Sequence, residues 1–163
     1  MLAHAALLGF ALLMLLAAWT DARAYTIPNW ISGAIIALWP LGAFALGLTW
    51  AEAGMSLLTG LAVLAVMIGL WAPGWIGGGD AKLIAAGALW FGWPGAVTFI
   101  LLAGVCGGVL ALALVLARRF APAMPGMKAE WMADGVLAQG SPAPYGIAIA
   151  AGALWAIPFT LAA

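Results

Sequence analysis

Apolar runs long enough to cross a lipid bilayer follow one another along almost the whole 163-residue chain. A transmembrane helix needs about 20 consecutive apolar residues. Lipid cannot hydrogen-bond the backbone of an open strand, so only helices are plausible here. The runs predict helices at about residues 2–20, 29–50, 54–72, 80–93, 95–117 and 144–162. We therefore expect an all-α bundle of six transmembrane helices that fills residues 1–163 as one integral membrane domain.

The composition excludes several other classes of protein. Hydrophobic residues make up 67% of the chain and charged residues 6%, with a mean hydropathy of +1.19, whereas a soluble domain has about 25% charged residues. The net charge is zero, so neither nucleic-acid binding nor a polybasic grip on anionic lipid is indicated. The single Cys106 allows no internal disulfide, and the single His4 is no metal site. We expect no cofactor and no metal.

The first apolar run also has features of a secretory signal. Residues 22–24, ARA, have the small-x-small pattern of a cleavage site. However, no Lys or Arg precedes the run, and Arg23 would lie inside the cleavage motif. We therefore expect the first helix to remain in the protein.

The basic residues predict the orientation in the membrane. With six spans, Arg23 follows the first helix, Lys82 lies at the start of the fourth, and Arg118, Arg119 and Lys128 follow the fifth, so all five basic residues fall in or beside the first, third and fifth connections. The other connections and both termini carry none. Because cytoplasmic loops are enriched in Lys and Arg, we expect these three connections in the cytoplasm and both termini on the opposite side.

Two aspartates fall at the same predicted depth of the membrane. Asp21 ends the first predicted helix and Asp80 begins the fourth, so both lie at the cytoplasmic end of the bundle, where they could meet. Taken singly, Asp80 could be a helix N-cap and Asp21 an interface marker. Carboxylates within spans are costly and usually mark functional sites. We therefore interpret the two together as a candidate site.

Two carboxyl groups that share a site can hydrolyse an amide. Repulsion between them leaves one ionised and one protonated near neutral pH. The ionised group can take a proton from water while the protonated one hydrogen-bonds the carbonyl of the substrate. Asp80, at a helix N-terminus, is favoured as the anion, which hints that it is the base.

The residues around Asp80 and Asp21 allow a functional and a structural interpretation. Gly77, Gly78 and Gly79 permit positive φ and close approach of a substrate chain, or form only a flexible turn. Lys82 and Arg23 are each two residues from their aspartate, about 200° around a helix, so neither pairs with it locally. Both are expected to extend to the lipid headgroups, or alternatively to polarise the site or hold a substrate carboxylate.

Three segments carry a resemblance to a known family. They are DARAYTIPN at 21–29, GGGDAKL at 77–83 and PYGIAIAAG at 144–152. Their order and spacing are similar to those of the type IV prepilin peptidases, which are GxGD aspartic peptidases. The resemblance implies an endopeptidase that removes the short basic leader from prepilins or pseudopilins at the cytoplasmic face of the prokaryotic inner membrane. It also implies that Asp21 and Asp80 are the catalytic pair.

The chain departs from the longer members of that family. Those members carry paired CxxC motifs in an N-terminal segment and also methylate the new pilin N-terminus. Here there is one cysteine, so methyl transfer is not expected. The short architecture resembles that of the peptidases of Flp, or tight-adherence, pili.

Other residues receive weaker interpretations. Asn29 is expected to be a local cap of the second helix or, alternatively, to shape the site. Tyr145 and Gly146 either line a pocket or merely begin the last helix. Within the 118–143 connection, apolar spacing over 127–138 predicts a short surface helix. The tryptophans near the predicted span ends indicate an aromatic belt.

Two other classes of protein remain open. A small proton- or cation-coupled transporter or channel subunit could use the same carboxylates, although these are expected nearer the membrane midplane in such proteins. A non-catalytic pilus assembly factor is the second alternative. The sequence leaves the oligomeric state open.

Overall fold

The computed structural model describes residues 1–120, 136–138 and 140–161. Within them the chain is helical and contains no strand, which confirms the predicted all-α class. The helices are α1 (Leu2–Ala24), α2 (Asn29–Ala45), α3 (Trp50–Trp71), α4 (Gly78–Phe120) and α6 (Tyr145–Leu161).

The long helix α4 is two helical arms joined at a break. Gly92 has φ 57° and ψ −169°, and Trp93 has ψ 132°, so neither residue is helical. The break separates residues 78–91 from 94–120 and lies where the sequence predicted the end of one helix and the start of the next. At 1.5 Å per residue the first arm rises only about 21 Å and the second about 40 Å.

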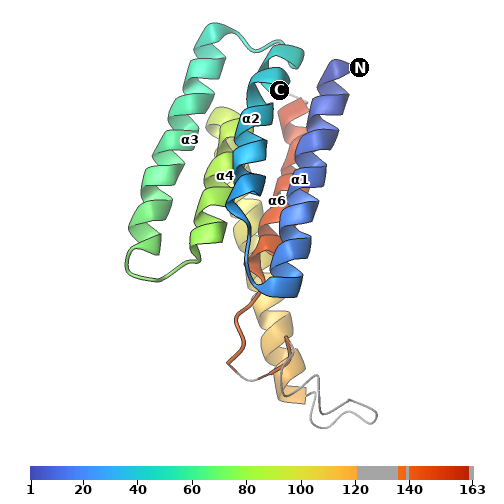
Figure 1. Ribbon diagram of the computed structural model, residues 1–163, viewed down its shortest axis with the longest axis vertical. Coiled ribbons are helices and arrows are strands. Elements are labelled where there is room, and N and C mark those ends of the chain that lie inside the picture. The colour runs from blue at the N-terminus through green and yellow to red at the C-terminus, as the bar shows by residue number, and fades with distance from the viewer. Residues whose placement is uncertain (121–135, 139, 162–163) are drawn as a thin grey trace.

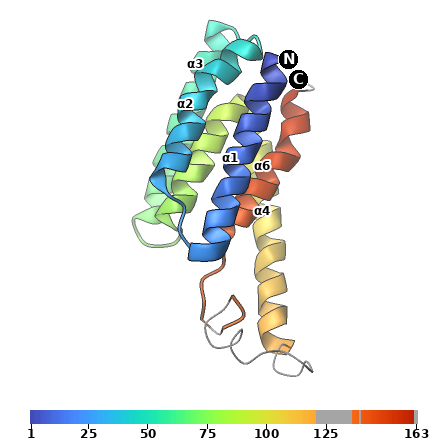
Figure 2. The same ribbon diagram turned by 45° about the vertical axis from the view of Figure 1, so that its right-hand side comes forward.

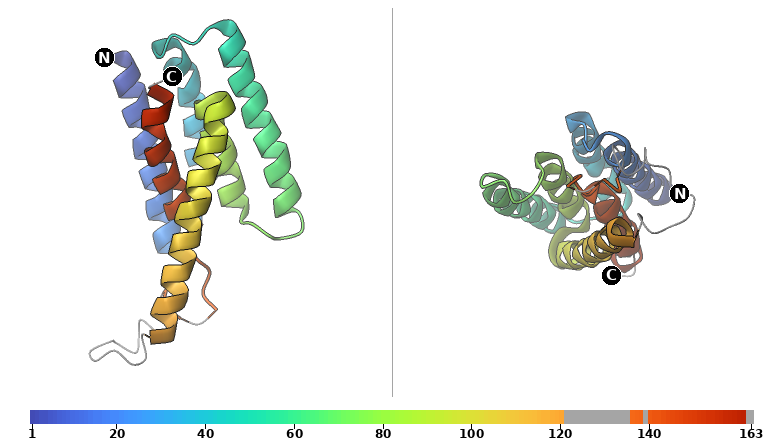
Figure 3. Two further views of the ribbon diagram at one scale, coloured as in Figure 1. Left: turned by 180° about the vertical axis from the view of Figure 1, so that it is seen from behind. Right: turned by 90° about the horizontal axis from the view of Figure 1, so that it is seen from below.

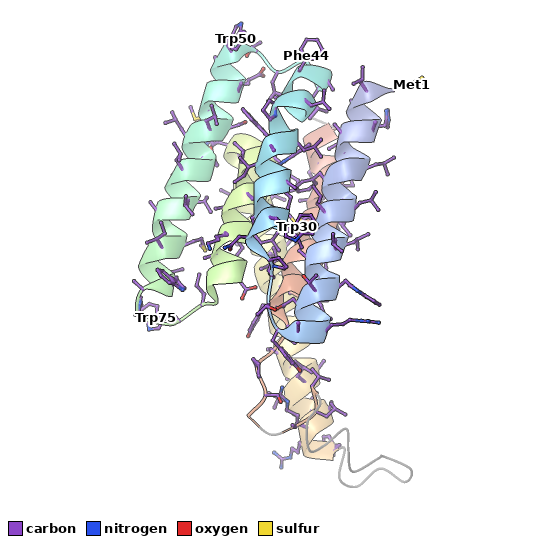
Figure 4. All side chains as sticks on the ribbon, in the orientation of Figure 1. Met1, Trp30, Phe44, Trp50 and Trp75 are labelled. Carbon is purple, nitrogen blue, oxygen red and sulfur yellow. The ribbon has the colours of Figure 1, made fainter. Side chains whose placement is uncertain are left out.

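The helices run alternately up and down (Figure 1). Both termini lie at one end of the bundle, and the connections α1–α2 and α3–α4 lie at the other (Figures 1 and 2). Figure 4 shows Met1, Phe44 and Trp50 at the first end and Trp75 at the second. Helices α1, α3 and α4 are long and apolar enough to cross a membrane, whereas α2 and α6 are shorter apolar helices. Six membrane spans therefore remain a prediction.

Helix ends differ from the predicted ones in two places that matter. Helix α1 continues to Ala24, where Tyr25 ends it with φ 50°, so Asp21 lies inside its last turn. Helix α3 begins at Trp50 because Thr49 and Glu52 form a capping box. The Thr49 hydroxyl accepts a hydrogen bond from the Glu52 N–H at 3.3 Å, and the Glu52 carboxylate accepts one from the Thr49 N–H at 2.8 Å. The T-x-x-E pattern is the sequence signal of this motif.

The core lies between α1, α2, α6 and both arms of α4. Phe10 of α1 stacks on Trp90 at 4.8 Å between ring centroids, and the Trp90 indole donates a hydrogen bond to the carbonyl of Ile35 at 2.9 Å. Helix α3 contributes few buried residues and packs mainly on α4. Most of its side chains are exposed and apolar, as expected of a surface that faces lipid.

Helix α6 lies between α1 and the second arm of α4 (Figure 3). At the crossing with α4, a Cβ on Gly152 would lie 2.4 Å from the backbone nitrogen of Ala103. Only glycine therefore allows this approach. Such contacts between small residues are the usual means of packing helices in lipid, where the hydrophobic effect does not drive helices together.

The connection between α1 and α2 packs on the start of α4. Ile27 is buried, and a Cβ on Gly79 would lie 3.1 Å from its Cβ. This contact brings the segment that follows Asp21 against the segment that carries Asp80.

The break in α4 yields a prediction for stability. Gly92→Ala places a side chain in a conformation open essentially to glycine alone and 2.6 Å from the Ser56 hydroxyl. We expect it to lower the free energy of unfolding in mixed micelles by about 3 kcal/mol or more. Gly47→Ala is the matched control, because Gly47 has φ 75° but open space at its Cβ, and should cost only about 1 kcal/mol. Equal losses of unfolding free energy in the two variants would show that the contact between position 92 and Ser56 of α3 does not affect stability.

The contact between Ile27 and Gly79 can be tested by cross-linking. In a Cys106→Ala background, Ile27→Cys with Gly79→Cys should form a disulfide under mild oxidation, because the two Cβ atoms would lie 3.1 Å apart and need only a small shift to reach the usual separation of about 3.8 Å. A gel-mobility assay with a maleimide polymer reports the free thiols. The pair Gly33→Cys with Gly79→Cys is the control, because a Cβ on Gly33 meets nothing within 4 Å. Cross-linking of the control alone would contradict the packing.

Candidate active site

Asp21 is held by the start of α6. It is a buried carboxylate, with 6% of its surface exposed, near the end of a mainly apolar helix. Its Oδ2 accepts a hydrogen bond from the backbone N–H of Gly146, the second residue of α6, at 2.7 Å. The first N–H groups of a helix have no partner within the helix, so they are free to bind a carboxylate.

The contact requires glycine at position 146. A Cβ there would lie 2.9 Å from the Cβ of Asp21 and 3.0 Å from its Oδ2. A side chain would therefore push the carboxylate away from the helix end. Gly146 therefore belongs to the site through its contact with Asp21. In the sequence, this glycine is recognised by the PYG segment at the start of the last helix.

Asp80 lies in the first turn of α4 and is half-buried. Its carboxylate folds back over Gly77, where a Cβ would lie 2.9 Å from Oδ2. Asp21 and Asp80 lie close enough for their charges to interact. The structure thus brings the two predicted acids together from helices that are far apart in the sequence.

Both acids line one cavity of about 890 Å³. Its walls come from the end of α1, the α3–α4 connection, both arms of α4 and the start of α6. The second arm of α4 contributes mainly small residues at helical spacing: Ala103, Gly104, Gly107, Gly108 and Ala111. Apart from the two carboxylates, the side chains with polar atoms on its wall are the phenols of Tyr25 and Tyr145 and the indole of Trp75. The cavity is therefore an apolar space with two acids at one place on its wall.

The three glycines before Asp80 act through close approach. None of the three has a positive φ, so the positive φ that glycine permits is not used here. Gly77 lies under the Asp80 carboxylate, Gly79 packs on Ile27, and a Cβ on Gly78 would lie 3.0 Å from the indole nitrogen of Trp71. Gly77 alone of the three lines the cavity.

Lys82 and Asn29 contact each other instead of the cavity. The Lys82 ammonium donates a hydrogen bond to Oδ1 of Asn29 at 2.8 Å, and both side chains are exposed. The expectation that Asn29 caps α2 was wrong, because Pro28 is the N-cap and no side chain caps that helix. The bond instead joins the beginning of α2 to the beginning of α4, beside the contact between Ile27 and Gly79.

Arg23 lies away from the cavity as well. Its guanidinium stacks over the ring of Trp19 at 3.9 Å from the centroid, on the exposed side of α1. Arg118, near the end of α4, donates hydrogen bonds to the carbonyls of Val136 and Ser141, both at 2.9 Å. It thereby holds the segment that leads to Pro142 and Ala143 on the cavity wall.

Part of the cavity wall was not predicted from the sequence. Tyr25, Trp75 and Ile76 line it, and the only available signal was their proximity in sequence to Asp21 and Asp80. The predicted surface helix over 127–138 lies mostly outside the described residues, and its last residues, 136–138, are not helical. No group of three or more potential metal ligands occurs in the part of the chain that the structure describes.

Comparison with known proteins shows the family of the chain. A model of the type IV leader peptidase family matches residues 8–112, which include both acids and the cavity-lining part of α4. No curated protein and no solved structure matches the chain. Because the match covers more than half of the residues, the chain, an apolar helical membrane protein, belongs to the type IV leader peptidase family of proteases.

Proposed function

We propose that the protein is an aspartic endopeptidase that removes the basic leader of a prepilin or pseudopilin. The observation that carries the proposal is the convergence of Asp21 and Asp80 on one cavity. Membership of the leader peptidase family supports a peptide substrate. We further propose that its substrates are pilins of the Flp, or tight-adherence, type, and that it does not methylate the product.

The two acids supply the chemistry that amide hydrolysis needs. One carboxylate removes a proton from a water molecule as the water oxygen attacks the scissile carbonyl. The other carboxyl group donates a hydrogen bond to the carbonyl oxygen, where negative charge develops. The leaving nitrogen then receives a proton, and the pair returns to its starting state. No cofactor takes part in this scheme.

The cavity suits an extended peptide in a membrane. Gly77 and the small residues of α4 leave room for a second backbone beside the acids. The walls are mainly apolar, so a bound peptide would displace water from the acids and strengthen their interactions with the reacting carbonyl. An apolar stretch of substrate next to the scissile bond fits such walls.

The location of the acids favours a peptidase over a transporter. Asp21 lies in the last turn of α1 and Asp80 in the first turn of α4, so both are at one end of the bundle. Acids on an ion path are expected near the membrane midplane. We propose that this end faces the cytoplasm of a prokaryotic inner membrane, because Arg23, Lys82 and Arg118 lie there.

Substitution of either acid tests the proposal. We expect Asp21→Asn and Asp80→Asn each to lower the rate of leader removal by at least about 1,000-fold, because neither remaining carboxyl group can serve as both acid and base. The assay uses an Flp-type prepilin co-reconstituted with the protein and follows the mobility of the cleaved product on gels.

Glu52→Gln is the matched control, because Glu52 lies at the other end of the bundle and glutamine preserves the capping box. It should process prepilin at the native rate. An Asp variant that is folded and still processes prepilin would refute the proposed peptidase. Loss of proton-coupled flux without loss of processing would favour the transporter.

Thiol labelling tests the proposed orientation. In a Cys106→Ala background, Thr26→Cys lies at the end of the bundle that carries the acids and Ala51→Cys at the opposite end, and both positions are exposed. A membrane-impermeant maleimide should label Ala51→Cys in intact spheroplasts and Thr26→Cys only after lysis. The reverse pattern would place the acids outside the cytoplasm.

A further inference from the structure

The two acids have different surroundings, and the difference assigns their roles. Resting on the proposed peptidase function, we infer that Asp21 is the ionised member that accepts the proton of water, and that Asp80 carries the shared proton. The assignment reverses the hint from the sequence, where only Asp80 could be placed at a helix N-terminus. The structure places Asp21, in the last turn of α1, against the N-terminus of α6, and Asp80 in the first turn of α4.

The hydrogen bond from Gly146 favours the anion at Asp21. An N–H group that donates to a carboxylate stabilises its charged form, and the bond is short at 2.7 Å. The donor belongs to the first turn of α6, a 17-residue helix whose N-terminus carries partial positive charge. Because this bond occupies Oδ2, the other oxygen of Asp21 is available to take a proton from water.

Among the described residues, no helix other than α4 donates a hydrogen bond to Asp80 as α6 does to Asp21. The first turn of α4 favours an anion at Asp80, and the last turn of α1 disfavours one at Asp21, through the dipoles of their own helices. Against this, Asp21 alone receives a directed hydrogen bond from the N-terminus of a second helix, and we infer that this bond decides the order. Two carboxylates in one apolar cavity cannot both ionise easily. The proton that the pair shares therefore resides on Asp80.

Other charged groups do not change which of the two acids is ionised more easily. The basic side chains described near this end point elsewhere: Arg23 stacks on Trp19, Lys82 bonds to Asn29, and Arg118 bonds to backbone carbonyls. Helix α2, which packs on α1, has no ionisable residue. The remaining titratable groups on the wall of the cavity that holds Asp21 are Asp80 and the phenols of Tyr25 and Tyr145.

The assignment gives a balanced reaction. Water transfers a proton to Asp21 as its oxygen bonds to the carbonyl carbon, and Asp80 transfers its proton to the carbonyl oxygen. The resulting diol then returns that proton to Asp80 as the carbonyl re-forms. The carbon–nitrogen bond breaks while Asp21 gives its proton to the amine. Asp21 ends ionised and Asp80 protonated, as they began.

Gly146 is thus a positioning residue, and its role can be read from a pH profile. Gly146→Ala places a Cβ 3.0 Å from Oδ2 of Asp21, so the carboxylate must move away from the N–H. We expect kcat/KM for the Flp-type prepilin to fall and the acidic limb of its pH profile to move to higher pH by about one unit, while the basic limb stays in place. Gly69→Ala, on α3 with open space at its Cβ, should leave both limbs unchanged.

Each other outcome overturns the assignment. A shift of the basic limb alone would make Asp21 the proton donor, and a lower rate with both limbs unmoved would give Gly146 a packing role only. Should Gly146→Ala fail to fold, infrared titration of Asp80→Asn and Asp21→Asn compares the single remaining acids. We expect Asp21 to stay ionised to lower pH than Asp80, and the opposite order would refute the inference. Processing by Asp21→Asn would instead refute the peptidase itself.

Discussion

The close approach of α6 to its two neighbours is the constraint on which the rest of the structure depends. Gly152 lets α6 cross against the backbone of Ala103, and Gly146 lets its first turn press on Asp21. In lipid, the hydrophobic effect does not bring helices together as it does in soluble proteins, so close packing between small residues takes its place. The same packing therefore holds the bundle together and supplies a backbone N–H to a carboxylate that would otherwise be costly to bury.

The break in α4 gives the bundle an asymmetric end. The first arm is short and starts with Asp80, and the chain reverses at Gly92. The second arm then runs back past the level of Asp80 and continues beyond the other helices (Figure 1). Residues 103–111 therefore line the cavity that holds both acids. One interrupted helix thus provides an acid and the opposite wall of its cavity.

Much of this arrangement could be predicted from the sequence because lipid restricts the choices. Apolar runs predicted the helices, and the WPG segment predicted the break in α4. The pairing of Asp21 with Asp80 followed from the alternation of the helices. The contacts of Gly146 and the bond between Lys82 and Asn29 could not be predicted, because they depend on how distant helix ends meet. Likewise, the sequence does not show whether a glycine serves positive φ, as at Gly92, or close approach, as at Gly79.

In the proposed mechanism, Asp21 and Asp80 act together on one amide bond. A structure of the protein bound to a prepilin peptide with a hydroxyl-bearing tetrahedral carbon in place of the scissile amide would test this most directly. We expect the hydroxyl oxygen to lie within about 3.2 Å of a carboxyl oxygen of both Asp21 and Asp80. A peptide that binds in the cavity but contacts only one of them, or that binds elsewhere, would contradict the account.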